Sequence, residues 1–217
     1  MKTVLKLTPQ LLIEAYSAGV FPMAESRHGP IEWHSPDPRA ILPLDKQAFH
    51  IPRSLAKRIR SERFQISIDS AFERVIQACA EPRPKHPETW INHQIIDAYC
   101  QLHQQGQAHS IEAWQDCVDS GKAQPELQRK SPKLVGGLYG VALGGVFFGE
   151  SMFTRVTDAS KICLVKLVEH LQDRGFSLLD VQFANPHLDQ FGLIELPRHE
   201  YQQRLRAGLA TDTHWSA

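Results

Sequence analysis

The chain has 217 residues and a mass of 24.6 kDa, and its 24 basic and 24 acidic side chains give a formal net charge of zero. Hydrophobic residues make up 42% and charged residues 22%, which is ordinary for a folded domain and excludes a disordered or fibrous chain. No apolar run reaches the roughly 20 residues of a membrane span, and residues 1–6 lack the apolar core of a signal peptide. We therefore expect a single domain, or a main domain with a small lobe, in the cytoplasm.

The cysteines and histidines give no metal or disulfide signature. None of the 11 histidines falls in a metalloprotease-like helical pattern, so we expect no structural metal. The cysteines lie too far apart for paired-cysteine ligation and form no dense framework, which favours reduced thiols: Cys79, Cys100, Cys117 and Cys163.

The first forty residues combine a short helix with a proline-rich corner. Thr8 can cap a helix that Gly19 ends. Prolines in residues 20–39 predict a stiff path without regular structure. Phe21 and Trp33 would either offer contact surfaces on this path or fix a small N-terminal lobe to the main body. The expected units are residues 1–39 and 40–217.

A basic helix is expected over residues 51–63, which carry five positive charges against one negative. Pro52 suits its first turn, and the helical period places Arg53, Lys57 and Arg60 on one face. Such a face could hold phosphates, although clustered basic residues more often form a solvated surface.

Strands and helices then alternate up to residue 115. The apolar spacing predicts a short edge strand over residues 41–44 and a half-buried strand over residues 64–68. Two helices, over residues 71–79 and 89–106, and a strand over residues 109–114 are expected next. The polar tract 116–133 predicts a mobile loop inside a hairpin, because the strand pattern resumes directly after it.

Residues 134–161 are the most informative stretch. Apolar runs on both sides of Gly144-Gly145 predict a β-hairpin with positive φ at both glycines. A helix beginning at Thr157 or Asp158 should follow, and then a strand over residues 176–183. The chain should end with a short strand over residues 191–196, a helix over residues 199–209 and a frayed C-terminus over residues 211–217. This order predicts an α/β fold with a mixed, largely antiparallel sheet flanked by helices.

Three polar residues interrupt these apolar strands. Glu150 lies at the end of an apolar run, where a partly buried carboxylate needs a partner. Asp180 and Gln182 are two residues apart on a strand and should share one face. Each of the three could tie down a neighbouring loop instead of taking part in chemistry.

The chain resembles the leucyl/phenylalanyl-tRNA–protein transferases in nine short motifs, in the family's order and over nearly the whole length. These are Phe21-Pro22, Ser35-Pro36-Asp37-Pro38-Arg39, Thr89-Trp90-Ile91, Ala108-His109-Ser110-Ile111-Glu112, Leu134-Val135-Gly136-Gly137, Gly149-Glu150-Ser151-Met152-Phe153, Ala159-Ser160-Lys161, Asp180-x-Gln182-x-x-Asn185 and Glu195-x-Pro197-Arg198. Any one motif would be weak, but nine in series are not accidental.

The resemblance implies a monomeric enzyme that takes leucine or phenylalanine from charged tRNA. It would join that residue to the N-terminal amine of proteins that begin with arginine or lysine, which marks them for degradation in an N-degron pathway. It also implies an N-acetyltransferase-like main domain behind a small N-terminal lobe, with neither a metal nor coenzyme A.

The resemblance also implies roles for individual residues. Asp180 would orient Gln182, which would help to remove a proton from the attacking amine, and positioning would matter more than basicity because an amide is a poor base. Glu150 would accept hydrogen bonds from the donor's amino group, and Asn185 would position the acceptor peptide or the ester. The remaining expected contacts are an apolar pocket of Leu138, Phe147 and Leu164, adenosine stacking on Trp33 and Trp90, and phosphate binding by Arg53, Lys57 and Arg60.

Three departures from the family pattern leave alternatives open. The lead before Thr8 is short, Met23 stands where a tryptophan is frequent, and the 116–133 loop is long. Acidic N-terminal acceptors, or another donor such as arginine, remain alternatives. A coenzyme-A-dependent N-acetyltransferase is disfavoured by the missing glycine-rich pyrophosphate loop. A non-catalytic tRNA-binding module is disfavoured by the joint presence of Asp180, Gln182 and Glu150.

Overall fold

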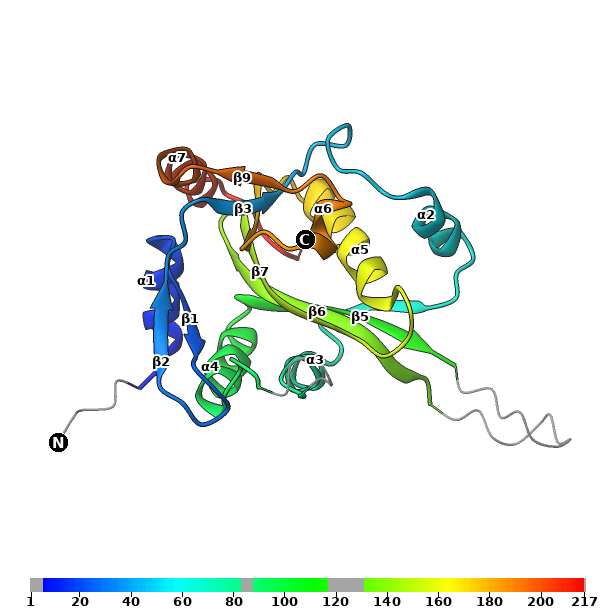
Figure 1. Ribbon diagram of the computed structural model, residues 1–217, viewed down its shortest axis with the longest axis horizontal. Coiled ribbons are helices and arrows are strands. Elements are labelled where there is room, and N and C mark those ends of the chain that lie inside the picture. The colour runs from blue at the N-terminus through cyan, green and yellow to red at the C-terminus, as the bar shows by residue number, and fades with distance from the viewer. Residues whose placement is uncertain (1–5, 83–87, 117–130, 217) are drawn as a thin grey trace, which may run out of the picture.

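The computed structural model describes residues 6–82, 88–116 and 131–216, and these form the expected mixed α/β fold (Figure 1). The helices are α1 (Pro9–Ser17), α2 (Arg53–Arg60), α3 (Phe72–Cys79), α4 (His93–Gln104), α5 (Ala159–Asp173), α6 (Pro186–Asp189) and α7 (Arg198–Leu209). The strands are β1 (Phe21–Ala24), β2 (Ile31–His34), β3 (Arg39–Leu42), β4 (Gln65–Ile68), β5 (Ala108–Gln115), β6 (Lys133–Leu143), β7 (Val146–Thr154), β8 (Leu178–Gln182) and β9 (Ile194–Leu196).

Seven strands form one sheet in the order β4-β5-β6-β7-β8-β3-β9, and only the β7–β8 pair is parallel. Helix α5 lies on one face of this sheet, and α3 and α4 lie on the other (Figure 1). The strand predicted for residues 41–44 is therefore not at an edge, because β3 pairs with both β8 and β9. Its apolar residues are buried on both sides, which a short run next to a proline did not indicate.

The β6–β7 hairpin is confirmed, but its turn differs from the expected one. Leu143 pairs with Val146 across Gly144 and Gly145. Of the two glycines only Gly144 takes a positive φ, of 53°. A type II′ turn needs a positive φ only at its first central residue, whereas the expected type I′ turn needs two.

The proline-rich corner does form regular structure, contrary to the sequence expectation. Strands β1 and β2 make a separate two-stranded sheet, in which Pro22 pairs with Trp33. A proline is tolerated there because a strand of a two-stranded sheet needs no hydrogen bond on its outer side. The preceding helix is as expected, since the Thr8 hydroxyl accepts a hydrogen bond from the backbone N–H of Leu11.

Two further boundaries differ from the pattern-based ones. Helix α4 begins at His93, not near residue 89, because the Asn92 side chain caps it by accepting from the Ile95 N–H at 3.0 Å. The C-terminus is not frayed at Trp215, whose side chain is only 8% exposed. The mobile loop expected at 116–133 lies mostly outside the described residues.

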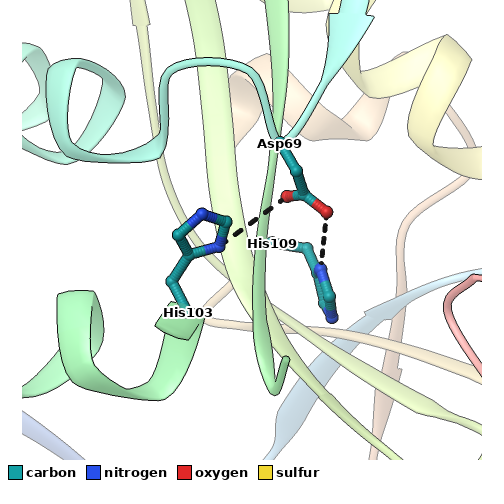
Figure 2. A group of neighbouring side chains, drawn as sticks. All are labelled: Asp69, His103 and His109. Atoms are coloured by element: carbon teal, nitrogen blue, oxygen red, sulfur yellow. Dashed lines mark hydrogen bonds and ion pairs between the residues drawn. The ribbon is translucent and has the colours of Figure 1, made fainter. Parts of the chain in front are cut away.

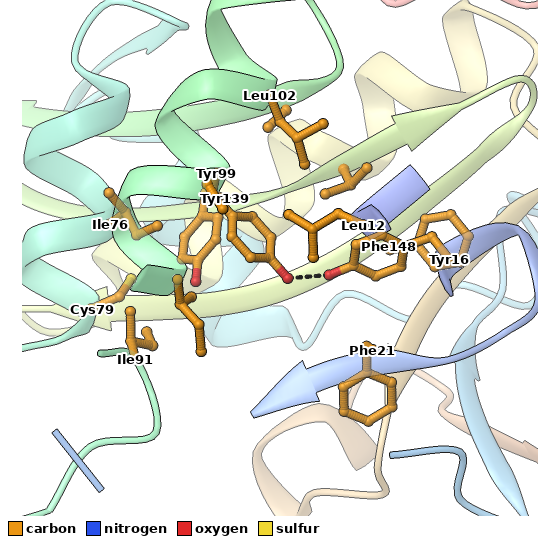
Figure 3. Close-up of a cluster of buried hydrophobic side chains, with 14 of the residues drawn as sticks. Leu12, Tyr16, Phe21, Ile76, Cys79, Ile91, Tyr99, Leu102, Tyr139 and Phe148 are labelled. Atoms are coloured by element: carbon orange, nitrogen blue, oxygen red, sulfur yellow. Dashed lines mark hydrogen bonds between the residues drawn. The ribbon is translucent and has the colours of Figure 1, made fainter. Parts of the chain in front are cut away.

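The N-terminal forty residues share a core with the main body. Leu12, Tyr16 and Phe21 pack in one buried cluster with Tyr99 of α4 and Phe148 of β7 (Figure 3). A second cluster fills the space between the sheet and α5. No helix in the described part of the chain is both long and apolar enough to cross a membrane.

Candidate functional site

The parallel strands β7 and β8 separate at a point where both continue. They pair only from Val146 opposite Leu178 to Phe148 opposite Asp180, although β7 runs on to Thr154 and β8 to Gln182. A cavity of about 320 Å³ opens in this gap, a size within the usual range of small-ligand sites. The fold itself therefore creates the site, because two diverging strands leave backbone and side chains uncovered between them.

The cavity is mainly apolar with a few polar groups on one wall. Leu138 of β6, Leu164 of α5 and Trp90, three of the residues named from the sequence, line it. The predicted polar residues Glu150, Gln182 and Asn185 also line it. Apolar walls not anticipated from the sequence come from β1, β7, α5, β8, α6 and the segment after β8: Phe21, Met23, Met152, Leu167, Leu179, Val181, Phe183 and Leu188.

Glu150 is turned towards the cavity by a β-bulge. Tyr139 pairs with Ser151 and Gly140 pairs with Gly149, so Glu150 has no cross-strand partner. Such bulges change the direction of a side chain and are frequent next to active sites. Glu150 is thus an inserted residue within β7, and not the end of the strand as the sequence suggested.

Burial raises the pKa of the Glu150 carboxyl to about 7. The hydroxyl of Tyr99 donates to Glu150 Oε2 at 3.2 Å, which favours the charged form but does not outweigh burial. The Gln182 side-chain amide lies 3.5 Å from Glu150 Oε1. A carboxyl that titrates near neutral pH in a cavity is suited to binding an amino group or to moving a proton.

Behind Glu150 lies a set of buried tyrosines that sequence reasoning assigned to the core or passed over. The hydroxyls of Tyr16 and Tyr99 are hydrogen-bonded to each other, which extends the contact from Glu150 to α1 (Figure 3). Burial raises the pKa of both hydroxyls well above 10, so they remain protonated donors. A buried carboxylate needs hydrogen-bond donors, and this need is the signal in the sequence that could have pointed to these tyrosines.

Asp180 lies beside the cavity and does not line it. Its fully buried carboxylate accepts two hydrogen bonds from Arg39, at 2.9 and 2.7 Å, and one from the Tyr201 hydroxyl at 2.8 Å. Burial lowers the pKa of Arg39, but its hydrogen bonds and charge interaction with Asp180 outweigh this and raise it. Arg39 is also stacked between the rings of Phe21 and Tyr201, each centred 4.7 Å from the guanidinium carbon.

Gln182 is held in a left-handed backbone conformation, with a φ of 62°. Its backbone N–H donates to Asp180 Oδ1 at 2.9 Å. Because this conformation ends the extended strand, the expected sharing of one face by Asp180 and Gln182 does not apply. A left-handed glutamine is unfavourable on its own, and strain of this kind is concentrated at functional sites. Asp180 thus positions Gln182 through the main chain.

Two predicted contacts lie outside the cavity. Phe147 is fully buried and packs against Trp215, with 5.3 Å between ring centres, so it lies behind the cavity wall. Trp33 is 38% exposed on β2 and does not line the cavity. Of the two tryptophans proposed to stack on a base, only Trp90 is in place to touch a ligand in this cavity.

The basic helix is confirmed as α2, and its side chains Arg53, Lys57 and Arg60 are exposed. The fourth, Arg58, is bound to Asp158 at the start of α5 by a 2.8 Å ion pair. Helix α2 lies next to α5 at the end of the molecule opposite the β1–β2 hairpin (Figure 1). The three predicted phosphate contacts are therefore not part of the cavity lining.

Comparison with known proteins gives one consistent result. A sequence profile described as leucyl/phenylalanyl-tRNA protein transferase matches residues 41–206, and one for the N-terminal domain of the same transferase matches residues 6–37. A leucyl/phenylalanyl-tRNA–protein transferase from Gloeobacter violaceus is 52% identical over 204 residues, which is 94% of this chain and 95% of that protein. A transferase of the same name from Paramagnetospirillum magneticum is 51% identical over 210 residues, covering 96% and 92%.

Proposed function

The chain belongs to the leucyl/phenylalanyl-tRNA–protein transferase family, and from this premise we propose that it joins leucine or phenylalanine from charged tRNA to proteins beginning with arginine or lysine. The enzyme is an aminoacyltransferase that forms a peptide bond at the N-terminal amine. The product enters an N-degron route to degradation. We further propose that the enzyme acts as a monomer in the cytoplasm, as the family resemblance implies.

The observation that carries this proposal is the juxtaposition of Glu150 and Gln182 at the wall of an otherwise apolar cavity. The apolar part suits the side chain of leucine or phenylalanine. Glu150 is placed to accept hydrogen bonds from the donor's amino group. Gln182 lies next to it, where the ester carbonyl of the same amino acid would be.

The reaction requires a neutral acceptor amine, a held ester and stabilisation of the developing oxyanion. The amine attacks the ester carbonyl, a C–N bond forms, the C–O bond to the ribose breaks, and the amine's proton ends on the ribose hydroxyl. Gln182 guides the amine while Asp180 fixes its backbone, and Asn185 positions the acceptor peptide or the ester. Trp90 stacks on the terminal adenosine. Trp33 does not line the cavity and would contact the adenosine only where the tRNA end lies outside it.

The two units of the chain divide this work. We propose residues 1–39 as a small lobe and residues 40–217 as the acyltransferase-like catalytic domain, and from the lobe Phe21 and Met23 line the cavity. Leu138 and Leu164 contact the donor side chain directly, and Phe147 supports them from behind.

Glu150→Gln is expected to alter the pH dependence of transfer. The carboxyl ionises as the pH rises through about 7, and only the ionised form attracts the donor's amino group strongly. For the native enzyme kcat/KM should therefore rise between pH 6 and pH 8 in two overlapping steps, one from Glu150 and one from the acceptor amine, whose usual pKa is about 7.7–8.0. The variant should keep only the amine step. A two-step profile retained in Glu150→Gln, with Glu169→Gln as the surface control, would contradict this role.

Loss of two positive charges from α2 should weaken tRNA binding. For Lys57→Ala with Arg60→Ala, we expect the slope of log affinity against log salt to fall by about one to two, because each lost phosphate contact removes roughly 0.7–0.9 from it. The matched control is Arg204→Ala with Arg206→Ala on α7, which removes the same charge elsewhere. Equal salt slopes for both pairs in fluorescence titrations would remove α2 from the tRNA site.

A coenzyme-A-dependent acetyltransferase is the second candidate for this fold, and one contact argues against it. The start of α5, where such a fold would receive a pyrophosphate, is occupied by Asp158, whose carboxylate is paired with Arg58 and with Lys161 at 3.6 Å. A second anion there would meet a fixed negative charge.

The proposed function is tested by supplying leucyl-tRNA or acetyl-coenzyme A with peptides that differ only at the N-terminal residue. Transfer of leucine to arginine and lysine peptides supports the proposal. Transfer to aspartate or glutamate peptides alone would keep the chemistry and replace the acceptor assignment. Acetylation without leucine transfer would establish the second candidate, and tRNA binding without any transfer would favour a binding module.

A further inference from the structure

The C-terminal tail returns to the main body and buries one large side chain. Trp215 is 8% exposed and packs among side chains from β5, α5, β7 and the segment before β8. Its ring is stacked on His109, with 4.3 Å between centres and 13° between planes, and it also contacts His170 and Phe147. A terminal residue with this many ring contacts is fixed by them and not by the helix that precedes it.

Polar contacts fix the same residue at two points. The Trp215 indole N–H donates to Asp69 Oδ2 at 2.9 Å. The Nε2 atom of His170 lies 3.0 Å from the Trp215 carbonyl oxygen, so this nitrogen carries the proton. Both ends of the residue are thus tied to different parts of the fold, Asp69 after β4 and His170 on α5.

The ring of His109 is placed between two hydrogen-bond acceptors. Its Nδ1 lies 2.8 Å from Asp69 Oδ2 (Figure 2), and its Nε2 lies 3.1 Å from the Gly106 carbonyl oxygen. Neither a carboxylate nor a carbonyl can donate, so only the doubly protonated ring satisfies both contacts. Burial raises the pKa of Asp69, but the hydrogen bond and charge of His109 outweigh this and lower it. An ion pair beneath the Trp215 ring is the arrangement that fits these contacts.

The same residues do not form a metal site, although Asp69, His103 and His109 place ligand atoms within 4.8 Å of one another. Both oxygens of Asp69 accept hydrogen bonds, one of them from the Ser110 backbone N–H at 2.8 Å. Both nitrogens of His109 face acceptors, and His103 Nδ1 lies 2.8 Å from the Ala108 carbonyl oxygen. The atoms that would bind a metal are already engaged.

We propose that Trp215 is a positioning residue for the rear of the donor pocket and that the Asp69–His109 ion pair holds it in place. We call this ion pair, together with its contacts to Trp215, the clasp. Few residues separate Trp215 from the pocket. Phe147 touches Trp215 and pairs across the β7–β8 ladder with Leu179, which lines the cavity. The Phe147 ring also lies directly against Gly140, where an added methyl group would come within 2.4 Å of it. The pocket part of this inference rests on the proposed function, and the clasp itself does not.

The clasp is tested with the indole N–H signals of the four tryptophans in NMR spectra of the full chain. Trp215→Phe identifies the signal of Trp215 by its loss. At one fixed pH this signal should be protected from solvent exchange in the native chain, and it should exchange about tenfold faster in His109→Gln. His199→Gln, at an exposed histidine on α7, is the matched control. Equal exchange rates of this signal in the native chain and in His109→Gln would overturn the clasp.

The pocket role is tested by the ratio of kcat/KM for leucine and phenylalanine donors. Effects on the amino group or the tRNA cancel when this ratio is compared between variants, so only the side-chain pocket changes it. We expect Trp215→Leu and His109→Gln to change the ratio about threefold or more. An unchanged ratio in variants whose tail is shown to be open would overturn the positioning role. A native chain that transfers neither amino acid would overturn the proposed function and with it the pocket role, while the indole signal still decides the clasp.

Discussion

Gln182→Ala should lower kcat for aminoacyl transfer by about 10²- to 10³-fold, the usual effect of removing one fixed hydrogen-bonding group from a transition state. Binding of tRNA should change little, because the basic face of α2 is untouched. Gln182→Asn should also lose most activity, since the amide is withdrawn by one methylene although asparagine tolerates the left-handed conformation. Single-turnover transfer from leucyl-tRNA to an arginine peptide measures both.

Stability separates this effect from a folding defect. At a φ of 62° glycine is free of the strain that glutamine bears, so Gln182→Gly should be at least as stable as the native chain and still inactive. Gln77→Ala on the exposed face of α3 is the matched control for losing a glutamine side chain. Activity within threefold of native in Gln182→Gly would show that this amide has no part in the reaction.

Arg39→Met should reduce the free energy of unfolding by about 3–5 kcal/mol, the largest stability effect that we expect in the chain. The substitution leaves the fully buried Asp180 carboxylate with two donors among the described residues, the Tyr201 hydroxyl and the Gln182 N–H. It also removes the contact from Arg39 to the Gly19 carbonyl at 3.1 Å. Denaturant unfolding followed by circular dichroism gives the value.

The double variant Arg39→Met with Asp180→Leu tests the cause. If an unpaired buried charge accounts for most of the loss, the double variant should be more stable than Arg39→Met alone, while remaining inactive because Gln182 is no longer fixed. The surface ion pair of Arg155 with Glu81 provides a contrast, since breaking an exposed pair should change stability by only about 0–1 kcal/mol. A loss of less than 1 kcal/mol in Arg39→Met would contradict the account of Asp180.

Local patterns predicted most elements but not how the elements pair. The Gly144-Gly145 hairpin, the α5 helix and the strand that holds Asp180 could be read from periodicity and turn residues. The interior place of β3 could not, because a four-residue run carries no information about which strands lie on either side. The start of α4 was missed because the capping role of Asn92 competes with an apolar pattern that begins earlier.

The candidate site shows the same division. Glu150 and Gln182 were found because polar residues in apolar strands stand out, whereas Asn185 came from the family resemblance, and all three line the cavity. Arg39, the partner of Asp180, and Tyr99, the partner of Glu150, were not found from the sequence. An arginine in a loop motif and a tyrosine on the apolar face of a helix look ordinary there. Which side chain meets which buried charge depends on contacts between residues 51 to 141 positions apart.

The most direct test of the central claim is transfer of labelled leucine from charged tRNA to an arginine peptide, with Glu150→Gln, Gln182→Gly and the native chain measured side by side. The account predicts rapid transfer by the native chain, a loss of about 10²-fold or more in Gln182→Gly, and a changed pH profile in Glu150→Gln, with all three chains folded and binding tRNA. Native rates in both variants would place the chemistry outside this cavity and contradict the account.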